Sequence, residues 1–336
     1  MKKIVSAHII LLFILITQNL LSFAIENTGI KLSMSSALFI SQFTILLPFI
    51  IYCIGKKKNP FEVIRFKKIS FKSALLCVVI ALCSYPVVVC LNMLSMLFVE
   101  NAMQNVMTEV VSNGILFSLL FMAVMPAIVE ETIFRGVVYN VYSKRKPLLG
   151  VFFSAFLFGA MHMNFNQMPY AFFLGIIMAL VMEACDSVIA PMIVHFTLNG
   201  SSTLLSCLSM SMMSSEEINQ MSQADDFKTM LMESYRVAIA ESGMELTEKI
   251  IPMFMAFTII LYVLIGIGAL AVVLALVYGV FRVNGRKPIE VFKADYSDTE
   301  YIENKKGKYK KNRMIDIPVL LFTGYCIVMC VLSAIG

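Results

Sequence analysis

The stretch MPAIVEETIFRGVVYNVY, Met125–Tyr142, places two adjacent glutamates and one arginine inside an otherwise apolar segment. A charged side chain at the centre of a bilayer costs about 2.5–3.5 kcal/mol on insertion scales. Leucine would serve hydrophobic packing better, so we infer that Glu130, Glu131 and Arg135 build a polar site inside a membrane helix.

Spacing divides these three charges into a pair and a single carboxylate. Glu131 and Arg135 are four residues apart, so on a helix they share one face and can form a charge-assisted ion pair. Glu130 lies about 100° further round the helix and has no such partner in the segment. Glu130 is therefore the carboxylate available for chemistry. The alternative is that all three residues form only a structural salt bridge.

The composition of the whole chain predicts a polytopic membrane protein. Of its 336 residues, 59% are hydrophobic and 15% are charged, and the mean hydropathy is +0.82. Ordinary soluble domains are about 45–50% apolar and about 25% charged. We predict an all-α transmembrane bundle of about nine spans (eight to nine). The basic residues lie in loops between apolar stretches, which indicates membrane topology rather than nucleic-acid binding.

The apolar stretches also predict how the chain crosses the membrane. With the N-terminus inside, 22 of the 27 basic residues fall in inner segments and four in outer segments, with Arg135 inside a span. This asymmetry predicts a multi-pass protein of the cell membrane with a cytoplasmic N-terminus. The predicted spans are Ile4–Ala24, Ser36–Gly55, Phe71–Val99, Gly114–Tyr142, Leu148–His162, Met168–Glu183, Val188–Cys207, Ile251–Phe281 and Ile315–Ile335.

Four parts of the chain follow from this pattern. Residues 1–113 hold N-terminal transmembrane helices, and residues 114–208 hold the charged segment with two further polar spans. Residues 209–250 form an outer polar segment, and residues 251–336 hold C-terminal transmembrane helices joined by a basic inner loop, which anionic headgroups should attract. Apolar residues at helical spacing in the outer segment predict an amphipathic helix. These residues are Phe227, Met230, Leu231, Tyr235 and Ala238.

Two of the three histidines join the charged segment as candidate site residues. His162 ends one apolar stretch, and His195 lies in the next but one with Asn199 four residues later, so His195 and Asn199 share a helix face. His8, near the start of the first span, is interpreted as incidental. Glu183 and Asp186 lie near the predicted membrane interface and are left out of the site.

Two prolines precede site residues by four positions. Pro126 precedes Glu130 and Pro191 precedes His195. Proline cannot donate a backbone hydrogen bond, so each frees the carbonyl four residues earlier, Met122 in the first case. We therefore expect bent helices with exposed carbonyls lining a polar pocket.

Three motifs in this order resemble the CPBP family, which comprises CAAX prenyl proteases and bacteriocin-processing or bacteriocin-immunity membrane proteins, also called the abortive-infection family. The motifs are Glu130-Glu131-x-x-x-Arg135, Phe158-x-x-x-His162 and His195-x-x-x-Asn199, within Gly114–Cys207. The resemblance implies a helical intramembrane endopeptidase. The family also contains members with immunity or scaffolding roles.

Carried over by position, the resemblance implies a role for each residue. Glu130 would be the base that activates water, His162 would help to hold that water, and Glu131, held by Arg135, would support the site. His195 and Asn199 would stabilise the oxyanion of the tetrahedral intermediate, which suits donors fixed in a cavity of low dielectric constant. No Ser or Cys stands as an obvious nucleophile beside a histidine, which favours attack by water.

A metal ion is the open alternative for this chemistry. Glu130, His162 and His195 could supply two histidines and a carboxylate to zinc, leaving a position for water. The sequence has no His-Glu-x-x-His helix, and Asn199 beside His195 suits hydrogen bonding better than ligation. We therefore expect a mechanism that requires no cofactor, with zinc as the second choice.

Three functions remain open from the sequence. The first is an endopeptidase acting on a membrane-delivered peptide that is hydrophobic or lipid-modified. The second is a non-catalytic protein of bacteriocin self-immunity or membrane scaffolding. The third is a transporter with a proton relay, against which the lack of a repeated half argues.

Overall fold

The structure is a computed structural model, and it describes residues 2–29, 32–99, 109–143, 147–213, 231–232, 234–237, 239, 251–293, 302–303, 309–310 and 315–335. These residues are helical except for turns and two short strands, β1 (Ile302–Glu303) and β2 (Tyr309–Lys310), which pair antiparallel. The all-α prediction is confirmed.

Helices coincide with every predicted span, with ends that differ by a few residues. Seven of those described are long and apolar enough to cross a membrane, so the chain is a multi-pass membrane protein, but the count of about nine is not confirmed. The helix α9 has only 15 residues, and α11 falls outside the seven. The principal helices are α1 (Lys2–Thr28), α2 (Met34–Gly55), α4 (Phe71–Met96), α9 (Pro147–Met161), α10 (Met168–Cys185), α11 (Ile189–Met212), α14 (Ile251–Val283) and α16 (Ile317–Ile335).

The predicted span at residues 114–142 is the least regular part of the bundle. It becomes a run of five helical segments, two of which have the wider π-helical turn. Such turns are rare and often mark functional sites. The segments are α6 (Ile115–Leu119), η1 (Leu120–Val124), α7 (Met125–Glu131), η2 (Thr132–Tyr139) and α8 (Asn140–Ser143).

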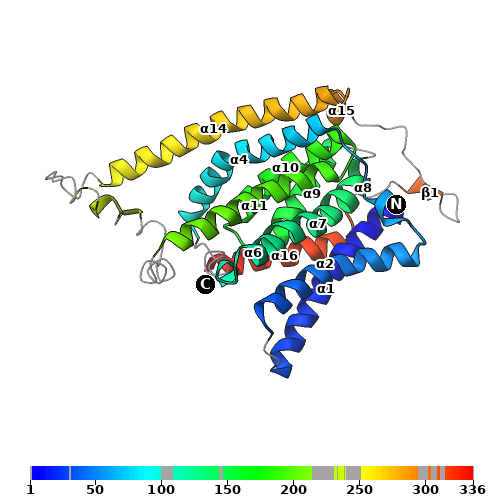
Figure 1. Cartoon of the computed structure of the whole chain (residues 1–336). Coiled ribbons are helices and arrows are strands. Elements are labelled where there is room, and N and C mark those ends of the chain that lie inside the picture. The colour runs from blue at the N-terminus through cyan, green and yellow to red at the C-terminus, as the bar shows by residue number, and fades with distance from the viewer. Residues whose placement is uncertain are drawn as a thin grey trace.

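The helix α10 lies at the centre of the bundle. It packs against α9, α11, α4, α14 and η2, while α1 packs against α2 and α16. In Figure 1, α14 runs beside α4 along one edge of the molecule, and α1 and α2 lie on the opposite side. The middle of the chain, residues 115–143 and 147–212, thus lies between the two terminal sets of helices.

Helix ends are set by local hydrogen bonds. Ser33 and Ser70 cap α2 and α4, each accepting a hydrogen bond from the backbone N–H three residues later, as N-cap serines do. Asp186 ends α10 in the left-handed conformation, with φ of 50°, a region that Asp tolerates better than most residues.

One end of the bundle gathers segments that the sequence places on the inner side. Arg65 Nη1 lies 3.0 Å from Asp186 Oδ1 and 3.6 Å from Glu183 Oε2, and Arg286 Nη1 lies 3.3 Å from Glu183 Oε1. Lys67 also pairs with Asp186. We call these five residues the end cluster; it joins the loop before α4, the α10–α11 turn and the turn after α14. The predicted topology places these five residues on one side of the membrane, and both the topology and the side stay predictions.

The electrostatics of the end cluster show at Asp186. Burial raises the pKa of this carboxyl, but hydrogen bonds from Lys67 and Arg65, with the charges of both, lower it by more. The pKa of Asp186 therefore lies below its ordinary value, and the carboxylate is ionised at neutral pH.

The interpretation of His8 as incidental is wrong. Its side chain is fully buried, its Nδ1 lies 2.7 Å from Asp316 Oδ1, and its Nε2 hydrogen-bonds to the Tyr142 hydroxyl. His8 therefore joins α1 to the start of α16 and to α8. The sequence could not show this because Asp316 is more than 300 residues away.

The outer segment is only partly described. Tyr235 stacks on Phe254 of α14, with ring centroids 5.9 Å apart, and its hydroxyl hydrogen-bonds to Thr258. The predicted positions Phe227, Met230 and Ala238 lie outside the described residues. The same holds for residues 294–301, 304–308 and 311–313 of the basic inner loop.

Candidate active site

Glu130 and Glu131 end α7, the short α-helical segment between the two π-helical ones. Pro126 near the start of α7 has no N–H for the turn before it. The Met122 carbonyl in that turn instead accepts a hydrogen bond of 2.9 Å from Asn199 Nδ2 on α11. The carbonyl that the proline frees therefore fixes a site residue on a neighbouring helix.

An ionic network joins Glu131, Arg135 and His195. The Glu131 and Arg135 side chains in it have no contact with solvent. Arg135 Nη1 donates to Glu131 Oε1 at 2.8 Å, and both side chains are 0% exposed. The same carboxylate oxygen lies 2.9 Å from His195 Nδ1. The ion pair expected from the four-residue spacing is thus present. With Asn199, these residues are called the buried network below.

The neighbours of His195 define its proton positions. Asn199 Nδ2 lies 2.9 Å from the Met122 carbonyl oxygen and 3.2 Å from His195 Nε2. A carbonyl can only accept, so one amide hydrogen of Asn199 goes to Met122 and the other meets a lone pair on Nε2. Nε2 therefore accepts, and Nδ1 carries the proton that is donated to Glu131.

Glu130 lies beside this network but does not belong to it. Its Oε2 is 4.0 Å from His195 Nε2, and its side chain is 13% exposed, compared with 0% for Glu131. A distance of 4.0 Å is longer than a hydrogen bond. Catalytic contacts are often long without substrate and tighten when it binds. Glu130 is thus the more accessible carboxylate, within about one ångström of hydrogen-bonding reach.

His162 reaches the site only through an aromatic ring in this structure. Its Nδ1 donates to the Phe158 carbonyl at 2.9 Å, which leaves Nε2 as the possible acceptor. The Phe158 ring lies edge-on to His162 at 5.0 Å and edge-on to His195 at 6.0 Å between centroids. Among the described residues, His162 makes no hydrogen bond or ion pair with Glu130, His195 or Asn199.

Close packing surrounds the arginine. The Arg135 guanidinium lies over the Phe158 ring, 4.3 Å from its centroid, a favourable cation–π arrangement. Gly175 of α10 lies against both α9 and this arginine. A Cβ atom there would lie 2.8 Å from Ala155 Cα and 3.2 Å from Arg135 Nη2.

Comparison with known proteins supports the family resemblance from which the roles of these residues were inferred. Residues 112–201 match the family model described as type II CAAX prenyl endopeptidase Rce1-like. This segment is an Rce1-like domain. All six predicted site residues lie inside it, and the helices before and after it lie outside the match. Neither the curated proteins nor the solved structures compared with the chain gave a match.

The Rce1-like domain does not present a complete zinc site. Within the part of the chain that the structure describes, no three His, Cys, Asp or Glu side chains are placed to hold a metal ion. Both ring nitrogens of His195 already have protein partners, Glu131 and Asn199. The proposed set of Glu130, His162 and His195 therefore does not fit a metal ion in this arrangement, and we derive no step through one.

Tyr85 supports the Rce1-like domain from outside it, and the sequence reasoning missed it. Its hydroxyl donates to the Leu198 carbonyl at 2.7 Å and lies 2.8 Å from Ser201 Oγ. Leu198 directly precedes Asn199, so Tyr85 of α4 holds the turn of α11 that presents the amide. The available signal was a tyrosine next to Pro86 in an otherwise apolar stretch.

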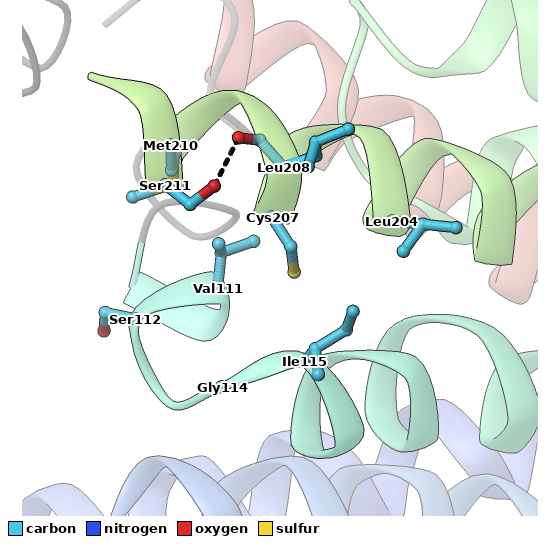
Figure 2. Close-up of a pocket in the computed structure, with 9 residues that line it drawn as sticks. All are labelled: Val111, Ser112, Gly114, Ile115, Leu204, Cys207, Leu208, Met210 and Ser211. Carbon is cyan, nitrogen blue, oxygen red and sulfur yellow. Dashed lines mark hydrogen bonds between the residues drawn. The ribbon is translucent and has the colours of Figure 1, made fainter.

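An apolar cleft of about 530 Å³ lies where the start of α6 meets the last turns of α11. Figure 2 shows Val111 and Ile115 on one side and Leu204, Cys207 and Leu208 on the other. Leu204 follows Asn199 by five residues, about 7.5 Å along a helix. The cleft therefore shares α11 with the buried network and lies at the start of the same span, Ile115–Ser143, although Glu130 and His195 do not line it.

Proposed function

We propose that this chain is an intramembrane endopeptidase that hydrolyses a peptide bond of a membrane-associated peptide by glutamate-activated water. The observation that carries this proposal is the position of Glu130. An accessible carboxylate stands 4.0 Å from His195 Nε2, beside a second carboxylate that is fully buried and engaged. Two adjacent glutamates with such different surroundings can take different roles, one as base and one as structural anion.

These positions support the following proposed reaction. Glu130 takes one proton from a water molecule while the water oxygen bonds to the carbonyl carbon of the substrate. The carbonyl oxygen becomes an oxyanion. Glu130 then gives that proton to the amide nitrogen, the carbon–nitrogen bond breaks, and a carboxylic acid and an amine leave. His162, whose Nε2 can accept a hydrogen bond, is the proposed second contact for the water.

The oxyanion requires hydrogen-bond donors, and the donors of this site are engaged with other protein atoms in the form described above. In that form, Nε2 of His195 accepts and both amide hydrogens of Asn199 are engaged. A proton taken up from bulk water at Nε2 before the reaction, and returned to bulk water after the products leave, turns that nitrogen into a donor and releases the Asn199 hydrogen that faced it. Glu131 holds Nδ1 in the same position in either form. His195 and Asn199 would then both face the oxyanion.

The proposed substrate is a hydrophobic or lipid-modified peptide delivered through the bilayer. The apolar cleft beside the buried network and the membrane helices around it support this class. We propose no nucleic-acid partner and no required cofactor. The matched family is described by its CAAX prenyl endopeptidase activity, so a prenylated peptide is the first substrate to test.

Glu130→Gln tests the proposal. The protein is reconstituted in liposomes with a prenylated C-terminal peptide or an unmodified apolar peptide, and the products are identified by mass spectrometry. Cleavage should fall about 10²–10⁴-fold, the usual contribution of a general base, while thermal unfolding stays close to wild type. Glu109→Gln, which changes an exposed glutamate before the matched helices, is the matched control and should cleave normally.

Unchanged cleavage by Glu130→Gln would contradict the proposal. The same variant also separates the endopeptidase from the immunity or scaffolding alternative. A protective role that depends on packing survives the loss of the Glu130 carboxylate, whereas protection that depends on hydrolysis does not.

A further inference from the structure

A second pocket, of about 440 Å³, lies on the other side of η2 from the buried network, and its mouth carries three lysines and one glutamate, Glu62, for a net positive charge. We call it the lysine pocket. Lys56, Lys57 and Lys58 line it at the end of α2, and Ala7 and Ile10 of α1 and Val137 of η2 supply apolar walls. The three lysines are exposed and the three apolar residues are buried.

The position of the lysine pocket matches the border between hydrocarbon and headgroups. Three candidate membrane spans, Ser6–Thr28, Met34–Gly55 and Ile115–Ser143, meet at it. The lysines directly follow Gly55, the last residue of α2, so they stand where the apolar span ends. Phosphate groups of lipids lie at this depth, and basic pockets between membrane helices bind them.

The backbone at Lys57 strengthens the case for a functional cation. Its φ is 49°, in the left-handed region, where a glycine usually ends a helix. A lysine held there costs some stability. The turn therefore contains three consecutive lysines, although glycine at position 57 would be less strained.

Asn140 adds a polar contact inside the lysine pocket. Its Nδ2 donates to the Val63 carbonyl at 2.7 Å, which fixes the orientation of the amide. Its Oδ1 is buried and has no hydrogen-bond partner among the described residues. An unpaired buried acceptor is unfavourable, so a ligand with a hydroxyl donor would satisfy it.

We propose that the lysine pocket binds an anionic phospholipid with a glycerol headgroup. The phosphate faces Lys56, Lys57 and Lys58, a headgroup hydroxyl donates to Asn140 Oδ1, and an acyl chain lies against the apolar walls. Bound lipid joins α1, the turn after α2 and η2, so it braces the helix that carries Arg135 from the side away from His195. This site does not depend on the proposed hydrolysis.

The chain has no tryptophan, so one introduced tryptophan can report on the pocket. Tyr52→Trp places it in the wall of the lysine pocket, and Phe257→Trp places it on the exposed face of α14 as a reference. Each full-length protein goes into phosphatidylcholine nanodiscs with a small fraction of brominated phosphatidylglycerol, which quenches nearby tryptophan. Quenching of the Tyr52→Trp protein should be several-fold stronger than that of the reference.

Charge variants test whether the lysines of the pocket cause the preference for phosphatidylglycerol. The triple change K56Q/K57Q/K58Q should weaken the preference for phosphatidylglycerol at least about tenfold, since each basic residue near an anionic surface adds about fivefold. The control K68Q/K72Q/K287Q removes the same charge from exposed lysines that do not line the pocket. It should keep most of that preference. Native mass spectrometry of proteins without the tryptophan should show one retained phosphatidylglycerol that the first triple variant loses.

Three results would overturn the proposal. Equal quenching by brominated phosphatidylcholine would show ordinary bilayer contact, and an equal loss in both triple variants would show general surface charge. A retained phosphatidylglycerol in K56Q/K57Q/K58Q would place the lipid elsewhere.

Discussion

The buried network contains one carboxylate and the end cluster contains two, each within reach of basic groups, but the two regions differ in how far they are enclosed. Glu131 and Arg135 are 0% exposed, whereas the end-cluster side chains Arg65, Asp186 and Arg286 are 15%, 28% and 34% exposed. Water screens the second group and barely reaches the first. Loss of an ion pair should therefore lower the stability of the fold more in the buried network than in the end cluster.

The two regions also differ in redundancy. Asp186 has three cationic neighbours, Arg65, Lys67 and Arg286. Glu131 bonds through a single oxygen. Within the described part of the chain, its Oε2 and the Nε and Nη2 atoms of Arg135 are buried without a hydrogen-bond partner. Removing one member leaves the end cluster paired but leaves the buried network with an isolated charge.

Arg135→Met should have the largest effect. It leaves the buried Glu131 carboxylate without its cation, and removing one partner of a buried pair costs about 3–5 kcal/mol. Thermal unfolding and folded yield in detergent measure the loss. The double variant E131Q/R135M removes both charges and should recover part of the stability. A neutral result for the single variant would show that water reaches this pair.

Gly175→Ala should have the next largest effect. The added Cβ would meet the Ala155 backbone at 2.8 Å, so α9 and α10 must move apart around Arg135. Overpacking of this kind costs about 1–3 kcal/mol. Gly268→Ala, on α14 with open space around it, is the control and should be neutral or stabilising. Equal stability of both variants would show that the interface yields easily.

Tyr85→Phe tests how far the enclosed region extends. It removes the hydrogen bond to the Leu198 carbonyl and should cost about 0.5–1.5 kcal/mol. If Tyr85 also positions Asn199, the rate of cleavage should fall by more than substrate affinity. Tyr262→Phe, at a partly exposed tyrosine on α14, should change neither quantity. A stability loss with normal kinetics would limit Tyr85 to packing.

Asp186→Asn should have the smallest effect and should depend on pH. The folded pKa of Asp186 is below its ordinary value of 3.8, so its carboxylate stabilises the fold above that value. The contribution is lost as pH falls through the folded pKa. At neutral pH the variant should be less stable by about 1 kcal/mol or less. The two unfolding curves should converge in acid and in high salt. A gap independent of pH would exclude the electrostatic explanation.

The sequence predicted the parts of this structure that depend on local spacing. Four-residue spacing predicted the Glu131–Arg135 pair, and Pro126 predicted that the Met122 carbonyl would need another partner. Apolar stretches located the helices to within a few residues. Each of these features follows from residues that are close together in the chain.

Contacts between distant residues escaped the sequence reasoning. Asp316 beside His8, and Tyr85 beside Leu198, depend on how helices pack, which no local pattern shows. The approach of His195 to Glu131 rather than to Glu130 is also a packing result, because both glutamates were available to it. The roles proposed for Glu130, His162, His195 and Asn199 stay predictions until the variants are measured.

The π-helical turns of residues 120–124 and 132–139 have a consequence for chain length. A wide turn holds one residue more than an α-helical turn, so it acts as an insertion that the fold retains. Deleting one residue from either turn would remove that extra residue and narrow the turn to α-helical geometry, while the helix beyond it keeps its place. In the first turn this would redirect the Met122 carbonyl that accepts from Asn199, and in the second it would shift Arg135, which donates to Glu131. The register of this helix is thus as much a part of the site as its side chains.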